Sequence, residues 1–178
     1  MDPIELALLS RARRAYEAGR LRWALRVAPF VLLAAGASLV CGRPLALTCW
    51  LSCALLPLAV GLGFAGGSAG RAVVPGLLAG SAALALPLLV RTVGNACIGP
   101  SCMELCLPAC VVGGAIAGAF IAARAARQEH EAPFVLAALA VAGLMGSLGC
   151  SLGGLAGVAG MLAGALVAGA PVLIAARR

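Results

Sequence analysis

Charged and aromatic side chains are scarce in this chain of 178 residues. Charged residues make up 11% of the sequence and aromatic residues 4%, there is no lysine, and His130 is the single histidine. Nucleic-acid binding needs a basic surface with a recognisable fold or with aromatic side chains that stack on bases, and this composition supplies neither. The sequence also has no Ser, His and Asp set on one plausible face, no glycine-rich phosphate loop after a strand and no paired carboxylates. We therefore expect neither direct nucleic-acid binding nor an enzyme.

Long apolar runs take up most of the sequence. Hydrophobic residues make up 63% of the chain and the mean hydropathy is +1.09, which is more apolar surface than a soluble protein of this length can bury. A helix needs roughly 20 apolar residues to cross a bilayer. We expect an all-α, polytopic membrane protein with six transmembrane helices near residues 24–41, 45–65, 72–90, 104–123, 133–150 and 153–176. Ionisable residues are almost absent from these stretches, which disfavours an ion-coupled transporter.

The arginine residues predict the orientation of the chain in the membrane. Cytoplasmic loops near membrane helices collect Lys and Arg. With the N-terminus inside, eleven of the thirteen basic residues are cytoplasmic, and only Arg43 and Arg91 lie outside. We therefore expect both the N-terminus and the C-terminus in the cytoplasm, and the net charge of +7 is explained mainly by this topology.

Residues 1–23 predict a cytoplasmic amphipathic helix ahead of the six-helix bundle of residues 24–178. Asp2 is the expected N-cap, with Pro3 in the first turn and Glu5 at the capping-box position. Apolar residues follow at helical spacing, and Gly19 is expected to loosen the helix before the first span. Such a helix either lies on anionic lipid or binds a cytoplasmic partner. The candidate partner-binding residues are Ile4, Leu8, Leu9, Arg11 and Tyr16.

Glycine pairs four residues apart recur in the fourth and sixth spans. Small residues at this spacing let helix backbones approach closely in lipid. We interpret these pairs as packing sites within the bundle. They are Gly114 with Gly118, Gly153 with Gly157, and Gly160 with Gly164.

All eight cysteines fall at or near loops that the arginine pattern places outside the cytoplasm. They are Cys41, Cys49, Cys53, Cys97, Cys102, Cys106, Cys110 and Cys150. Residues four apart on a helix have Cβ atoms about 5–6 Å from each other, whereas a relaxed disulfide needs about 3.5–4.5 Å. Bridges within one helix are therefore disfavoured, and bridges between helices or to the loop residues Cys41, Cys97 and Cys150 are favoured.

Three uses of these thiols stay open. Structural disulfides are expected outside the cytoplasm. Exposed or strained thiols respond to oxidants or metals. A soft-metal site for Zn, Cu, Cd or Hg is the third use, with Cys102, Cys106, Cys110 and Glu104 as candidate ligands.

The chain resembles the NrsF-type membrane anti-sigma factors. The resemblance rests on the six-span topology and on cysteine spacing, mainly over residues 97–178. Cys102 or Cys106 matches the family's cysteine near the start of the fourth span, and Cys150 matches the one between the fifth and sixth spans. Ala122-Ala123-Arg124 and Ala175-Ala176-Arg177-Arg178 close the fourth and sixth spans. The chain differs from the family in its six further cysteines and its very short N-terminal region.

The resemblance implies a multi-pass protein of the bacterial inner membrane. Such a protein holds an extracytoplasmic-function sigma factor at the cytoplasmic face and responds to oxidant or heavy metal through periplasm-facing cysteines. Two alternatives are a small soft-metal transporter or binding protein, and a disulfide-stapled accessory subunit of a membrane complex. The expected partners are membrane lipid and the sigma factor, and a homo-oligomer stays open.

Overall fold

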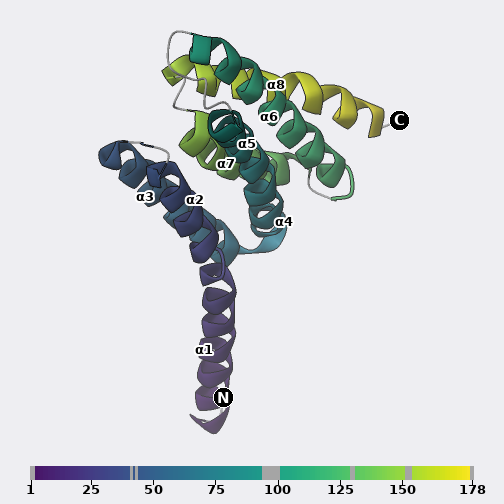
Figure 1. Ribbon diagram of the computed structural model, residues 1–178. Coiled ribbons are helices and arrows are strands. Elements are labelled where there is room, and N and C mark those ends of the chain that lie inside the picture. The colour runs from purple at the N-terminus through teal and green to yellow at the C-terminus, as the bar shows by residue number, and fades with distance from the viewer. Residues whose placement is uncertain are drawn as a thin grey trace.

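The computed structural model describes residues 3–40, 42, 44–93, 101–128, 131–150 and 154–176. All regular structure in these ranges is helical, which confirms the predicted all-α class for this part of the chain. The helices are α1 (Pro3–Leu25), α2 (Ala28–Val40), α3 (Leu45–Ala65), α4 (Gly67–Arg71), α5 (Val73–Val93), α6 (Ser101–Ala125), α7 (Glu131–Cys150) and α8 (Gly154–Ala176) (Figure 1).

Six helical segments in the described ranges are long and apolar enough to cross a membrane, as the hydropathy predicted. The first, Arg11–Val40, combines the second half of α1 with α2, and the others lie in α3, α4 with α5, α6, α7 and α8. Large apolar side chains stay exposed on the outer surface, among them Val40 at 89% and Leu155 at 90%. Apolar surface of this extent is suited to lipid rather than water. The chain is a multi-pass membrane protein.

The first span differs from the sequence prediction in the place of its break. Gly19 lies inside α1, and the helix continues to Leu25 before a turn at Arg26 and Val27. The turn is tightened by hydrogen bonds from the amide nitrogens of Arg26 and Val27 to carbonyl oxygens three residues earlier, 3.1 and 3.3 Å long. Pro29 explains the position, since it has no amide hydrogen to donate to the carbonyl of Leu25, and proline fits the first turn of the new helix α2.

The connection between α3 and α5 also differs from the prediction. Residues 66–71 were expected to form a loop, but Gly67–Arg71 forms the short helix α4. Gly66, with a φ of 71°, ends α3 and directly precedes α4. Glycine adopts this left-handed conformation without the steric penalty of a side chain.

Helices α5 and α7 pack side by side and run parallel. Gly76 faces Ala138, and one turn later Gly80 faces Ala142, so residue numbers rise together along the contact. A Cβ at Gly80 would lie 3.0 Å from the Cα of Ala142. The lack of side chains at these glycines therefore allows the two backbones to approach closely.

Helices α6 and α8 form the most extensive helix pair, also parallel. Gly114 packs against the backbone of Met161, and Gly118 packs against the backbone of Ala165. In return, Gly164 of α8 packs against the backbone of α6. These contacts confirm the packing role predicted for Gly114, Gly118 and Gly164.

Four helices meet at one point in the middle of this unit. Ala83 of α5, Cys110 of α6 and Met161 of α8 form a buried cluster. Gly146 of α7 closes the fourth side, where a Cβ would lie 3.1 Å from the Cβ of Ala83. Helices α5 to α8 therefore form one tightly packed unit.

The hairpin of α2 and α3 lies against this unit along α7 (Figure 1). Val31, Leu55 and Leu148 are buried in the shared core. The hydroxyl of Ser38 donates to the carbonyl oxygens of Ala34, at 2.8 Å, and of Leu148, at 3.2 Å. This buried polar contact ties α2 to α7 in an otherwise apolar interface.

We predict that Gly118→Ala destabilises the protein by about 1–3 kcal/mol, because a Cβ there would lie 2.6 Å from the Cα of Ala165. The midpoint of thermal unfolding in detergent measures the effect. Gly61→Ala is the matched control, since an added Cβ at Gly61 meets nothing within 4 Å. The better helix propensity of alanine is expected to raise its midpoint slightly. Equal midpoints for the two variants would contradict the role given to the α6–α8 contact.

Candidate functional site

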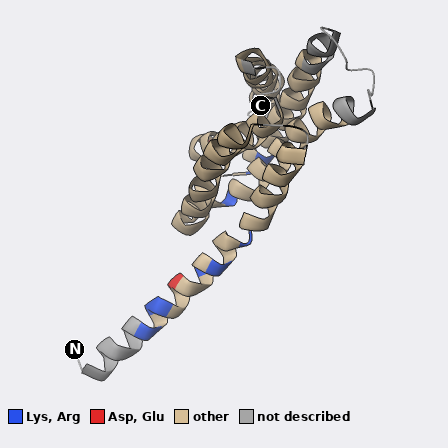
Figure 2. Cartoon of the chain, turned by 60° about the vertical axis from the view of Figure 1, so that its left-hand side comes forward, with Lys and Arg blue, Asp and Glu red and all other residues tan. Residues whose placement is uncertain are grey.

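Helix α1 projects from the bundle as an arm. Its first part extends away from the other helices, and its main packing partner is α3 (Figure 1). Figure 2 shows the charged residues gathered along α1, while the helices of the bundle are almost free of them. The arm is therefore the largest charged surface in the described part of the protein.

The arm is attached to the bundle through Arg20. The Nη2 atom of Arg20 donates a hydrogen bond to the carbonyl oxygen of Phe64, in the last turn of α3. The Cζ atom of Arg20 also lies 5.2 Å from the ring centroid of Phe64 and 5.5 Å from that of Tyr16. One guanidinium thus joins two aromatic rings and a helix end, and we call Arg20, Tyr16 and Phe64 the arginine clamp.

The end of α3 is well suited to bind a guanidinium. The last carbonyl groups of a helix have no partner within the helix and carry the negative end of its dipole. Gly66 follows these carbonyls, and a Cβ there would lie 2.8 Å from Nη2 of Arg20. Ala24 packs on Gly63 beside the clamp, where an added Cβ would lie 3.3 Å from the Cβ of Ala24. The last two turns of α1 are therefore fixed to α3.

Outside this contact the described arm residues face outward. Arg11 is exposed, and Tyr16 is 66% exposed although it contacts Arg20. Arg13 Nε pairs with Glu17 Oε1 at 2.9 Å on the exposed surface, and such a pair contributes little to stability. The predicted partner-binding residues Ile4, Leu8 and Leu9 lie on the helical backbone of α1, but their side chains lie outside the described residues.

The connections that carry or flank the cysteines lie at the other end of the bundle. The last turns of α2, α5 and α7 and the first turns of α3, α6 and α8 lie at the end of the bundle away from the arm (Figure 1). Cys102 and Cys106 lie in the first two turns of α6, and Cys150 is the last residue of α7. The side chains of these three residues and of Glu104 lie outside the described residues, as do Cys41 and Cys97.

Cys49 and Cys53 have free thiols on the exposed surface of α3. Their spacing of four residues places them on one face of the helix. Cys49 is in the second turn of α3, whereas Cys53 is about 12 Å along the helix from Leu45. An exposed side chain at that depth faces lipid. A water-soluble oxidant therefore reaches Cys49 more readily than Cys53.

Cys110 lies deeper in the bundle than its sequence position suggested. It is 1% exposed and packs with Ala83 and Met161 at the meeting point of four helices. The sequence grouped it with Cys102, Cys106 and Glu104 as a metal-ligand set. Of these four side chains, Cys110 is the one that the structure describes, and it faces the bundle interior.

The arginine clamp was missed by the sequence analysis. Arg20 was counted only as one of many cytoplasmic arginines, and its partner Phe64 lies 44 residues away in the chain. The one local signal is Gly66-Gly67, which marks the end of a helix with carbonyls to be bound. That signal does not reveal which side chain binds them.

No family model, no curated protein and no solved structure matches this chain.

We predict that Arg20→Ala loosens the arm. The variant loses the hydrogen bond to Phe64 and both ring contacts, together worth about 1–2 kcal/mol. Amide hydrogen exchange in residues 62–66 and 20–25 is expected to become about 5- to 30-fold faster. Arg22→Ala is the control, because Arg22 is exposed on the same helix and takes no part in the clamp. Similar exchange rates in the two variants would show that the clamp does not hold the arm.

Proposed function

We propose that this protein is a regulator of the bacterial inner membrane that binds a sigma factor at the cytoplasmic face and releases it when outer thiols react with oxidant or heavy metal. The observation that carries the proposal is the arm, a long helix that projects from the bundle and is held to it through α3. The proposed partner class comes from the resemblance to membrane anti-sigma factors.

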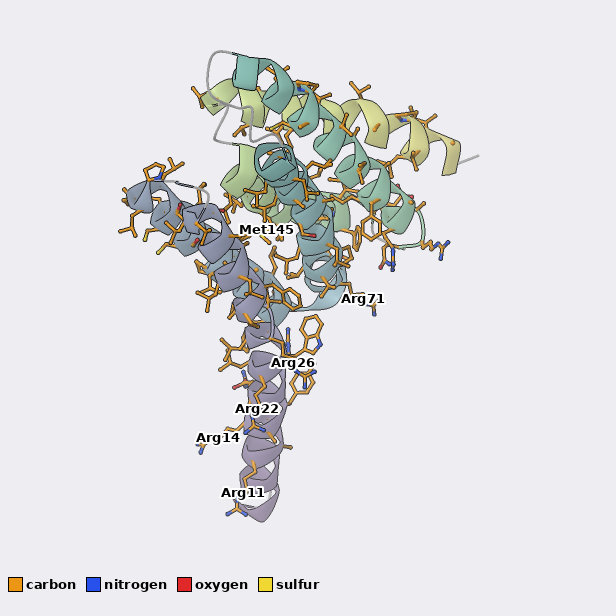
Figure 3. The ribbon with its side chains drawn as sticks, viewed as in Figure 1. Arg11, Arg14, Arg22, Arg26, Arg71 and Met145 are labelled. Atoms are coloured by element: carbon orange, nitrogen blue, oxygen red, sulfur yellow. The ribbon has the colours of Figure 1, made fainter. Side chains whose placement is uncertain are left out.

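The arm suits a protein partner because it offers a helix on which side chains are accessible from several directions. Arg11, Arg14 and Arg22 are exposed along it (Figure 3). Tyr16 adds a large aromatic surface. Tyrosine and arginine often provide much of the binding energy in protein interfaces. A helix of this kind binds in a groove of its partner through residues three and four apart.

The proposed orientation places the arm in the cytoplasm and the cysteine end in the periplasm. It rests on the distribution of arginine between the two sides of the predicted topology. The arm alone carries five arginines, and Arg26 follows in the turn after it. With this orientation the cysteine-bearing end faces the oxidising compartment.

Helix α3 offers a direct mechanical link between the two ends. It carries Cys49 and Cys53 in its first half and binds the arm through Phe64 in its last turn. Cys49 and Phe64 are separated by about 23 Å along the helix. Pro57 lies between them and has no amide hydrogen for the carbonyl of Cys53, which makes this the natural point for α3 to bend.

The response requires two packing arrangements of the bundle with different affinities for the partner. Formation of a disulfide from two thiols transfers two electrons to the oxidant and releases two protons. A soft metal instead binds two thiolates after they lose their protons. Either bridge between the start of α6 and Cys150 at the end of α7 would restrain the outer end of the bundle. The resulting shift would reach the arm through α7, α3 and the arginine clamp.

We predict that the full-length protein, purified from native membranes, carries a sigma factor that oxidant or soft metal releases. Replacing Leu8 and Leu9 together by Ser is expected to lower the recovered partner at least tenfold. Leu8 follows Ile4 by four residues and Leu9 precedes Tyr16 by seven, which are spacings of a helix-in-groove contact. Mass spectrometry of the co-purified proteins measures the effect.

The control for this experiment is Leu21→Ser, the same exchange on the part of α1 that lies beside α3. It is expected to keep the partner. Recovery of bound metal with no protein partner would instead support the soft-metal alternative. If the unchanged protein, the double variant and Leu21→Ser all bind the partner equally, the binding surface lies outside the arm.

We predict that replacing Cys102, Cys106 and Cys150 by Ser abolishes the transcriptional response to oxidant and soft metal. The basal repression is expected to stay, since the arm is unchanged. A reporter gene under the sigma factor measures both. Cys110→Ser is the control, because Cys110 is buried and out of reach of the stimulus. An unchanged response in the triple variant would contradict the role given to these thiols.

A further inference from the structure

A groove of about 290 Å³ opens on the side of the bundle near the root of the arm. Its lining comes from four helices and the turn after α1, and Figure 3 labels Arg26 and Met145 in it. The residues that the argument uses are Trp23 of α1, Arg26, Phe30 of α2, Leu78 of α5 and Met145 of α7. Phe30 is 59% exposed and Leu78 is 54% exposed. The groove is therefore apolar along its length, open to the side, and has a cation at one end.

The position of Arg26 along the membrane normal is unusual for a charged side chain. Helix α3, with 21 residues, is about 30 Å long and matches the hydrocarbon thickness. Its residue Gly63, two residues before the end of the helix, packs against Ala24 of α1. Arg26 follows Ala24 in the direction of the membrane interior, so its backbone lies about 6 Å inside the end of α3.

The length of α2 leads to a similar depth. Between Arg26 and Val40 the chain rises about 21 Å, which is about 9 Å short of the hydrocarbon thickness. An arginine at this depth extends its side chain toward the interface and needs an anion. Among the described residues the guanidinium of Arg26 has no hydrogen bond, ion pair or ring contact.

We propose that this groove binds one anionic phospholipid, with its phosphate on Arg26 and one acyl chain between α2 and α5. The acyl chain gains little by leaving the bilayer, which is as apolar as the groove. The preference for the site therefore comes from the headgroup. Arg71 does not line the groove, although it also lies near the end of α3, because the preceding Gly70 packs against the carbonyl of Leu62.

The lateral opening is the reason to favour a lipid over a peptide. A peptide bound in hydrocarbon would need partners for its backbone polar groups. Apart from the indole N–H of Trp23, Ser81 is the one neutral polar side chain of the lining, and its hydroxyl already donates to the carbonyl of Leu78 at 2.7 Å. An acyl chain needs no such partners.

The two tryptophans of the chain make the proposal testable by fluorescence. Trp23 lines the groove, whereas Trp50 is 78% exposed near the other end of α3. The full-length Trp50→Phe variant is reconstituted in phosphatidylcholine vesicles that contain a small fraction of acyl-brominated phosphatidylglycerol or acyl-brominated phosphatidylcholine. Bromine quenches tryptophan on contact. We expect brominated phosphatidylglycerol to reach half-maximal quenching of Trp23 at about fivefold lower mole fraction.

Two pairs of variants in this background separate the groove from the charged surface of the arm. Arg26→Gln is expected to remove the preference, and Arg127→Gln, the same exchange in the exposed turn after α6, to keep it. Ser81→Phe fills the groove and is expected to remove the preference as well. Ala85→Phe, an exposed position one turn further along α5 and outside the groove, keeps it.

A preference that survives Arg26→Gln or Ser81→Phe would overturn the proposal, because it would come from the arginine-rich arm as a whole. Equal quenching of Trp23 by the two brominated lipids would overturn it directly. In the reverse variant, Trp23→Phe, the remaining Trp50 is expected to show no preference. If Trp50 showed the same preference for brominated phosphatidylglycerol as Trp23, anionic lipid would be enriched around the whole protein. That result would also overturn the proposed site.

Discussion

Close approach of helix backbones is the interaction on which the bundle depends. In lipid, helices gain nothing by hiding apolar side chains from their surroundings, so packing contacts must hold them together. Gly114 and Gly118 allow α6 to approach α8, and Gly76 and Gly80 allow α5 to approach α7. The four helices then meet at Ala83, where a larger side chain would separate them. This unit forms the rigid support against which the α2–α3 hairpin and the arm are placed.

The membrane spans could be predicted from the sequence because each is a local property of about 20 consecutive residues. The same holds for the glycine contacts, whose spacing shows which face of a helix will pack. The break at Arg26 and Val27 was harder to place. Gly19 and Pro29 both disfavour helix, but a glycine costs only about 1 kcal/mol, whereas Pro29 removes the hydrogen bond to the carbonyl of Leu25 and would clash with it. The stronger effect set the break.

The candidate site could be predicted less completely, because its contacts join distant parts of the chain. Arginine near the start of a membrane protein is explained well enough by topology, and nothing in the sequence links Arg20 to Phe64. The cysteines were recognised as candidates from the sequence, but their surroundings in the fold were not. Their positions near helix ends could be predicted. Whether each side chain points into the bundle or outward could not: Cys110 is buried, whereas Cys49 and Cys53 are exposed on α3.

Arg20 and Arg26 lie less than two turns apart at the root of the arm. Arg20 contacts other parts of the protein, whereas Arg26 lines the groove that is open to lipid. Arg20 binds the carbonyl end of α3 and aromatic rings, which fixes the height of α1 relative to the bundle. That height sets the depth of Arg26, because α1 continues as a helix between the two residues and ends only at Leu25. The protein contact therefore determines which lipid groups the second arginine can reach. By the same reasoning, a headgroup on Arg26 favours the packing in which the clamp is closed, so that lipid and clamp stabilise one position of the arm together.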